Sequence, residues 1–389
     1  MIFFAGLYFF LEQRSLSWQA ARIRVRIAVT GTRGKSTVTR LIAAALQAAR
    51  FSVLAKTTGS KPVLIFPDGR EEEIKRRGKP TILEAKRVLK RGARLGVDAL
   101  VVEMMSIQPE CVFTESRRMI QPHILVITNV RVDHREEQGR SKPEIAASLA
   151  LAIPPKATVF LPEEELRPEF EVGAAKAKAK IVAVRKRILS EAPGPDQTQW
   201  PGFEENIRLA LAVTDSLGVP GDVARRGIKQ AKPDFGSLKA WQAELGRPPA
   251  DWTLVSAFAA NEPESTVMII DHLKNRLAPA RRNMVGVLNF RQDRGDRSLQ
   301  WLEAWEDRFF PGLDRLYVIG AHVHSFRLKK LARANGCLVP LAATSPAAIM
   351  KKITADEPAG AVLVGMGNMG GLGAKLVELW EQTGKPYGL

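Results

Sequence analysis

The residues with the clearest chemical potential form the run Gly31-Thr32-Arg33-Gly34-Lys35-Ser36-Thr37, which follows an apolar stretch. Glycines let a backbone curl so that successive N–H groups point inward at phosphate oxygens. A helix that starts at this point adds partial positive charge. Lys35 can then bridge the β- and γ-phosphates of a nucleotide, and the Ser36 hydroxyl can ligate Mg²⁺. The sequence therefore predicts binding of a nucleotide and Mg²⁺ through Gly31, Thr32, Gly34, Lys35, Ser36 and Thr37.

Two further apolar runs end in side chains that suit a metal site. Glu103 closes the run Val101-Val102, and Asp133-His134 follows Ile124–Thr128. Mg²⁺ prefers hard oxygen ligands and keeps several waters, so one carboxylate, one hydroxyl and phosphates suffice for it. Taken alone, Glu103 could also be a solvated strand end, and His134 a structural cap.

A dense charged segment lies in the second half of the chain. Arg291, Asp293, Arg294 and Arg297 follow the apolar run Met284–Leu288. Loops after strands often carry active-site groups, and arginines there can pair with phosphates or carboxylates in bidentate fashion. We predict a catalytic role for Arg291, with a merely solvated turn as the alternative.

These residues need elements that bring them together. Apolar, β-rich runs alternate with helix-patterned stretches, which predicts an α/β fold with a mostly parallel sheet and helices on both faces. The runs expected to be strands in the first half are Ile27–Thr30, Ser52–Leu54, Ala99–Val102, Ile124–Thr128 and Thr158–Leu161, with a hairpin at Pro62–Ile74. Turn-forming residues at 192–201, 232–236 and 246–251 interrupt the pattern, after which the alternation restarts. We predict an apolar segment at 1–23, a nucleotide-binding domain at 24–247 and a smaller Rossmann-like domain at 248–389.

The first eleven residues, Met1 to Leu11, are nearly all apolar. A helix of that length reaches about half of the ~30 Å hydrocarbon core of a bilayer. The segment lacks the basic start and small-residue cleavage site of a secretory signal. It is consistent with the remnant of a membrane anchor, with an interfacial segment, or with a first helix packed on the domain.

The charge balance is strongly basic. Lys and Arg number 58 against 41 Asp and Glu, a formal net charge of +17. Such an excess attracts anions, but the basic residues form no single tract and are not interleaved with aromatic residues, which disfavours nucleic acid as a partner. The two cysteines, Cys111 and Cys337, match no zinc or redox spacing, and a reducing cytoplasm is expected.

The form T-G-T-x-G-K-S-T, in which Val29 takes the first glycine position of a full Walker A motif, resembles the Mur ligases and folylpolyglutamate synthases. The Glu103 and Asp133-His134 segments and a later Glu205-Asn206 pair support this resemblance in the expected order. The resemblance implies that Glu103 and His134 hold Mg²⁺ together with Ser36, and that Asn206 contacts adenine.

Three more stretches narrow the resemblance to the ligase subunit of poly-γ-glutamate synthases. They are Arg33–Leu41 with Lys56-Thr57-Thr58-Gly59, Phe258–Glu262 with Ser265-Thr266, and Asn289–Arg297 with Gly365-Met366-Gly367-Asn368. The resemblance also implies nucleotide or interdomain contacts for Lys239, Asn261 and Glu262. At Lys239 and Glu262 the family pattern has Arg and Asp, and Lys keeps the charge of Arg but loses its bidentate fork.

Such a ligase would activate a glutamate carboxylate with ATP and join it to the amine of another glutamate. The resemblance further implies a poly-γ-glutamate product, membrane subunits as partners and a location at the inner face of the membrane; homo-oligomerisation is left open. Two alternatives remain: a folylpolyglutamate-type glutamate ligase, and a phosphate-loop ATPase that powers assembly or export.

Overall fold

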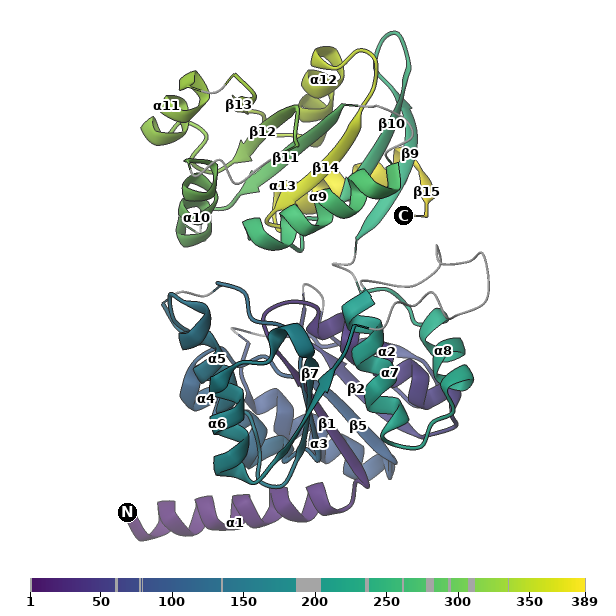
Figure 1. Ribbon diagram of the computed structural model, residues 1–389, viewed down its shortest axis with the longest axis vertical. Coiled ribbons are helices and arrows are strands. Elements are labelled where there is room, and N and C mark those ends of the chain that lie inside the picture. Colours follow the sequence, from purple (N-terminus) through teal and green to yellow (C-terminus); the bar gives the residue numbers. More distant parts are fainter. Residues whose placement is uncertain are drawn as a thin grey trace. The chain divides into compact units, whose positions relative to one another are not determined.

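The computed structural model describes residues 2–59, 62–76, 78, 80–133, 136–186, 204–234, 238–260, 262–277, 283–292, 295–306, 312–334 and 336–388. Its contacts divide the chain into two compact units, Met1–Phe235 and Gly236–Leu389 (Figure 1). Each unit contains its own sheet and its own buried core.

The first unit is built on an eight-stranded sheet in the order β4-β3-β2-β5-β1-β6-β7-β8. Its strands are β1 (Val25–Thr30), β2 (Val53–Thr57), β3 (Val63–Ile65), β4 (Glu71–Glu73), β5 (Ala99–Glu103), β6 (Ile124–Ile127), β7 (Thr158–Pro162) and β8 (Lys180–Val184). All neighbouring pairs are parallel except those made by the β3–β4 hairpin, which the sequence predicted at Pro62–Ile74. The central strand β1 is buried along its whole length, as a strand covered on both faces must be.

Helices cover both faces of this sheet (Figure 1). One face packs against α2 (Lys35–Ala48), α7 (Glu204–Asp215) and α8 (Gly221–Lys229). The other packs against α1 (Ile2–Ala21), α3 (Leu83–Leu95), α4 (Pro109–Phe113), η1 (Thr114–Ile120), α5 (Lys142–Ala150) and α6 (Pro168–Ala177), and η2 (Glu163–Glu165) follows β7. Side chains along a strand point alternately to opposite faces of the sheet. Ile27 and Val29 therefore lie in the core beneath α2, α7 and α8, and Ala28 lies in the core on the opposite face.

The second unit has a seven-stranded sheet in the order β13-β12-β11-β14-β10-β9-β15. Its strands are β9 (Lys239–Leu245), β10 (Ala250–Ser256), β11 (Met284–Phe290), β12 (Arg315–Gly320), β13 (Leu338–Pro340), β14 (Val362–Gly367) and β15 (Lys385–Tyr387). Helices α9 (Pro263–Leu277), α10 (Gly295–Glu306) and α11 (Phe326–Ala334) contribute to one core, and α12 (Pro346–Asp356) and α13 (Leu372–Thr383) to the other. All neighbouring strands are parallel except for the two pairs that β9 makes, with β10 and with β15. The predicted alternation of strands and helices in this half of the chain is confirmed.

The two units divide before the boundary near residue 247 that the sequence predicts. Strand β9 pairs antiparallel with β10 along its whole length, from Lys239 opposite Ser256 to Leu245 opposite Ala250. It therefore belongs to the second unit, and the contact boundary falls between Phe235 and Gly236. The turn signal at 246–251, which looked like an interdomain break, is the hairpin turn between these two strands.

Helix α1 is longer than the apolar run at its start and is part of the first unit. Its 20 residues continue past Leu11, and Leu16 and Ala20 are buried in the core with α3. Arg26 donates hydrogen bonds to the Ala20 and Ile23 carbonyl oxygens at 2.6 and 2.9 Å, which holds the end of the helix. Residues 1–23 therefore do not form a separate segment. Among the described residues, no helix is long and apolar enough to cross a membrane.

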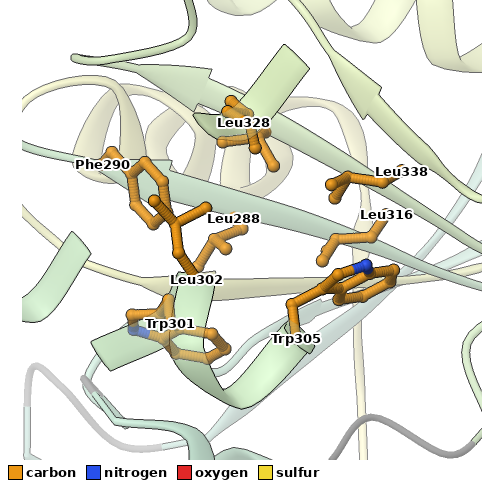
Figure 2. Close-up of a pocket in the computed structure, with 9 residues that line it drawn as sticks. Leu288, Phe290, Trp301, Leu302, Trp305, Leu316, Leu328 and Leu338 are labelled. Atoms are coloured by element: carbon orange, nitrogen blue, oxygen red, sulfur yellow. The ribbon is translucent and has the colours of Figure 1, made fainter. Parts of the chain in front are cut away.

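A small apolar gap lies in the second unit, beneath α10 and α11. Figure 2 shows Trp301, Leu302 and Trp305 facing strand residues such as Leu288 and Leu316 across it. The gap measures about 10 Å³. A cavity of this size with apolar walls offers a water no polar partner, so we interpret it as a packing gap and not as a substrate site.

Candidate active site

The phosphate loop runs from Gly31 to Gly34, between β1 and α2, as the sequence predicts. Gly31 and Gly34 have φ angles of +119° and +78°, in the region that favours glycine. A Cβ atom at Gly31 would lie 2.2 Å from the Thr128 hydroxyl oxygen, so only glycine fits against the neighbouring strand end. Gly34 is the residue before α2, which has no side-chain cap at its start. The first N–H groups of α2 are therefore available to an anion.

The Lys35 ammonium lies over this loop. It donates hydrogen bonds to the Gly31 and Thr32 carbonyl oxygens at 2.7 and 3.1 Å. Burial lowers the pKa of Lys35, and the nearby Glu103 carboxylate acts in the opposite direction. A cation in this position is placed to act on phosphates bound by the loop.

Ser36 and Glu103 meet as expected for a magnesium site. The Ser36 hydroxyl donates to Oε2 of Glu103 at 2.7 Å, although the two residues lie in different elements, α2 and β5. The backbone N–H of Thr58, just after β2, donates to the same oxygen at 2.6 Å. Glu103 is 3% exposed, so its carboxylate has a fixed orientation beside the loop.

The segment after β6 holds the phosphate loop from the other side. The Asn129 side chain accepts a hydrogen bond from the Arg33 N–H at 2.9 Å and donates to the Arg33 carbonyl oxygen at 3.3 Å. The Thr32 N–H donates to the Asn129 carbonyl oxygen at 3.0 Å. The sequence identified this segment only by its Asp-His pair, and no local signal distinguished Asn129.

Ion pairs extend this support. Arg33 pairs with the buried Asp133 at 3.0 Å, and Arg131 pairs with Glu165, which also accepts from the Val130 N–H at 3.2 Å. The loop after β6 is thereby fixed both to the phosphate loop and to the residues after β7.

Asn206 lies in the first turn of α7 and is buried against the phosphate loop. A Cβ atom at Gly34 would lie 2.6 Å from Oδ1 of Asn206. The described contact is with the loop backbone, and the predicted adenine contact stays a prediction.

Besides Glu103 and Asp133, the carboxylate of Asp234 lies near the phosphate loop, and the sequence analysis gave this residue no role. It lies 3.6 Å from Nε of Arg40, on α2. A Cβ atom at Gly59 would lie 3.3 Å from Oδ2 of Asp234 and 2.9 Å from the Ser36 hydroxyl oxygen. The Pro-Asp-x-Gly run around Asp234 was the only local signal, and nothing in it pointed to the phosphate loop.

The predicted residues of the second unit have contacts within that unit. The Arg291 guanidinium packs against the glycine-rich start of α13, where a Cβ atom at Gly370 would lie 2.4 Å from it. Glu262 accepts a hydrogen bond from the Ser265 N–H at 2.8 Å and so caps α9. Lys239 pairs with Glu381 at 3.0 Å. Their predicted roles in catalysis and nucleotide binding stay predictions.

Two predicted site residues, His134 and Asn261, lie outside the residues that the structure describes. Among the described residues, no group of three or more His, Cys, Asp or Glu side chains is arranged to hold a metal ion. The Ser36 hydroxyl and the Glu103 carboxylate nevertheless fit Mg²⁺, since this ion takes few protein ligands and completes its shell with phosphates and water. The loop, with Lys35 above it, fits the phosphates of a nucleotide.

Comparison with known proteins agrees with this geometry. The model of the poly-gamma-glutamate synthase CapB C-terminal domain matches residues 244–383, and that of the Mur ligase middle domain matches residues 29–185. The PGA synthase CapB of Bacillus subtilis (strain 168) is 32% identical over 294 residues, which cover 75% of this chain and 74% of that protein. The chain belongs to the CapB family, within the Mur ligase superfamily.

The capsule biosynthesis protein CapB of Bacillus anthracis is another relative in this family. It is 34% identical over 314 residues, which cover 77% of this chain and 66% of that protein. Among solved structures, Escherichia coli FolC in complex with ADP superimposes with a TM-score of 0.65 at 16% identity, over 96% of this chain and 94% of FolC. At this identity the likeness shows the fold, which is that of the Mur and FolC ligases.

Proposed function

We propose that this CapB-family protein is an ATP-dependent amide ligase that joins glutamates through the γ-carboxylate, in poly-γ-glutamate or capsule synthesis. The observation that carries the proposal is the contact between Ser36 and Glu103 beside Lys35 and the phosphate loop. This arrangement suits phosphoryl transfer, and family membership indicates which acceptor the phosphoryl group goes to.

The proposed reaction has two steps. An oxygen of the glutamate γ-carboxylate attacks the γ-phosphorus of ATP, so that an acyl phosphate forms and ADP leaves. The amine of a second glutamate then attacks the acyl carbon, phosphate leaves, and the amine nitrogen loses its proton. Positioning and charge neutralisation account for most of the catalysis in such transfers.

The described residues divide this work. Lys35 would offset charge on the β- and γ-phosphates, and the loop N–H groups would bind them. Ser36 and Glu103, with His134 as a further predicted ligand, would hold Mg²⁺, which neutralises charge on the transferring group. In the second unit, Arg291 is proposed to bind a phosphate or a substrate carboxylate. The nucleotide is proposed to contact Lys239, Asn261 and Glu262.

The test is turnover of ATP by the purified protein with Mg²⁺, with and without glutamate or oligo-γ-glutamate, following ADP and new amide together. Equal amounts of ADP and amide, both lost in Lys35→Ala and retained in the control Lys86→Ala, are expected. ADP release that ignores glutamate would replace the proposal with a glutamate-independent ATPase. Amide formed only with a folate-like acceptor would assign a folylpolyglutamate-type ligase instead.

We also propose that the protein lies at the inner face of the membrane, together with membrane subunits of a synthase. Support comes from the first half of α1, where Phe4, Tyr8, Phe9, Phe10 and Leu11 are each more than half exposed. Apolar side chains of this kind insert at a bilayer interface. Sedimentation with anionic vesicles should be lost in Phe9→Glu/Phe10→Glu, and equal sedimentation of both proteins would refute the membrane contact.

A further inference from the structure

A group of buried charges lies where β2 meets α3 and η1, which pack on the same face of the first-unit sheet. It consists of Lys56 on β2, Glu84 in the first turn of α3 and Glu115 in the first turn of η1, and we call it the Lys56 cluster. Lys56 and Glu115 are both 0% exposed, and Glu84 is 5% exposed. The sequence analysis quoted Lys56 in a motif but gave it no role.

The contacts within the cluster are specific. Nζ of Lys56 lies 3.4 Å from Oε2 of Glu84 and 3.8 Å from the sulfur of Met105. Arg76 makes a bidentate pair with Glu84, at 2.7 and 3.1 Å. Burial raises the pKa of Glu115, and the charge of Lys56 acts against this rise. Lys56 therefore sits between two carboxylates that come from different helical segments.

The Lys56 cluster is connected to Glu103 through two backbone segments. Lys56 pairs with Val102 in the β2–β5 register, directly before Glu103, and Thr58, whose N–H donates to Glu103, lies two residues after Lys56. On the other strand, Glu115 accepts hydrogen bonds from the Met105 N–H at 3.1 Å and the Ser106 N–H at 2.9 Å. The cluster thus fixes the chain on both sides of the Glu103 carboxylate.

Stability alone is a poor reason for such a cluster. Desolvating charges costs about as much as their pairing returns, and apolar side chains of similar volume often pack equally well. A role in orienting a metal-binding side chain would explain why buried charges are present despite the cost of desolvating them. Loss of such orienting partners typically weakens metal affinity about 10–100-fold.

We propose that Lys56, Glu84 and Glu115 are positioning residues that set the orientation of Glu103, and with it the affinity of the nucleotide site for Mg²⁺. This proposal rests on the proposed function. The cluster would act through the backbone at Thr58 and Met105, which connects it to the Glu103 carboxylate.

The test measures binding and not turnover. A non-hydrolysable ATP analogue is titrated into the full-length protein at a series of Mg²⁺ concentrations and also in EDTA. Lys56→Met is expected to raise the Mg²⁺ concentration for half-maximal binding about tenfold. It should leave the affinity measured in EDTA unchanged and speed hydrogen exchange at the Thr58 and Met105 amides. Lys86→Met is the matched control, since Lys86 also forms a lysine–glutamate pair, with Glu12 at 2.6 Å, but away from Glu103.

Glu115→Gln provides a second variant that keeps the shape of the side chain if Lys56→Met does not fold. It should raise the Mg²⁺ requirement in the same direction. An Mg²⁺ dependence equal to that of Lys86→Met in both folded variants would overturn the positioning role. Failure of the wild-type protein to bind the analogue with Mg²⁺ would instead overturn the proposed function, and this proposal with it.

Discussion

Replacing Gly34 with alanine tests how tightly α7 packs on the phosphate loop. Gly34 has a φ of +78°, and its added Cβ atom would lie 2.6 Å from Oδ1 of the buried Asn206. Gly69, in the β3–β4 turn, has a φ of +79° and nothing within 4 Å of such an atom. The two positions therefore share the backbone strain of an L-residue, and only Gly34 adds the close contact.

The expected costs follow from this difference. Gly69→Ala should lower the free energy of unfolding by about 1 kcal/mol, the cost of left-handed backbone for alanine. Gly34→Ala should add ~1–3 kcal/mol of overpacking to that strain, and so cost ~2–4 kcal/mol in total. Asn206→Ala in the Gly34→Ala background removes the contact. The double-mutant cycle should therefore give a favourable coupling of about 1–3 kcal/mol.

The assay must report on the first unit. Five of the seven tryptophans lie in the second unit, at positions 241, 252, 301, 305 and 380, so fluorescence would mainly follow that unit. Hydrogen exchange of α2 and α7 peptides under increasing urea gives the local free energy instead. Nucleotide binding should fall in Gly34→Ala and stay unchanged in Gly69→Ala. Equal destabilisation by the two substitutions, with a coupling within ~0.5 kcal/mol of zero, would refute the packing of Asn206 on the loop.

Three further predictions follow from described contacts. Glu103→Gln should lower ATP turnover on the order of 100-fold, or about 2.7 kcal/mol of transition-state stabilisation, because it removes the negative charge beside Ser36. EDTA should abolish turnover by the wild-type protein. Full activity of the variant, or of the wild-type protein in EDTA, would contradict the metal site. Asn129→Ala removes two hydrogen bonds to Arg33 and should lower the free energy of unfolding in urea by about 2 kcal/mol. It should also weaken nucleotide binding in a titration. Unchanged nucleotide affinity would contradict a role for Asn129 in holding the phosphate loop. Burial, and then the charge of Arg26, lowers the pKa of His123, so the folded state binds this proton less tightly than the unfolded chain. Stability should therefore fall as the pH drops below about 6.5, the pKa of an unfolded-chain histidine, and His123→Gln should flatten this dependence in thermal unfolding; an identical pH profile would exclude His123 as its source.

The local sequence pattern was sufficient to predict the strand and the helix on either side of the phosphate loop. The sequence predicted a strand into Thr30, a helix from Lys35 and the hairpin at Pro62–Ile74, and the structure has all three. These features depend on hydrophobic periodicity and on glycine and proline, whose conformational preferences are properties of the residues themselves. The Glu103 carboxylate, for which the resemblance implied a place with Ser36, accepts a hydrogen bond from the Ser36 hydroxyl at 2.7 Å, and its role in Mg²⁺ binding stays a prediction.

Partners far apart in the sequence could not be read from local pattern. Neither β8 nor β9 was predicted as a strand, and the residues of β9 were placed in the first domain. Whether a short segment forms a strand depends on the neighbours against which it pairs and packs more than on its own composition. Asn129 holds Arg33 from 96 residues away, and nothing in the type of either residue specifies the other.

The sequence by itself therefore indicated the glycine-rich loop with Lys35 and Ser36, and the strand and helix on either side of it. The tertiary structure alone decided what holds them in place: Asn206 against Gly34, Asn129 on the phosphate loop and the Lys56 cluster behind Glu103. The physical reason is that a polar side chain carries its charge and hydrogen-bonding groups in its identity, whereas its partner depends on which distant segments the packed core brings within a few ångströms.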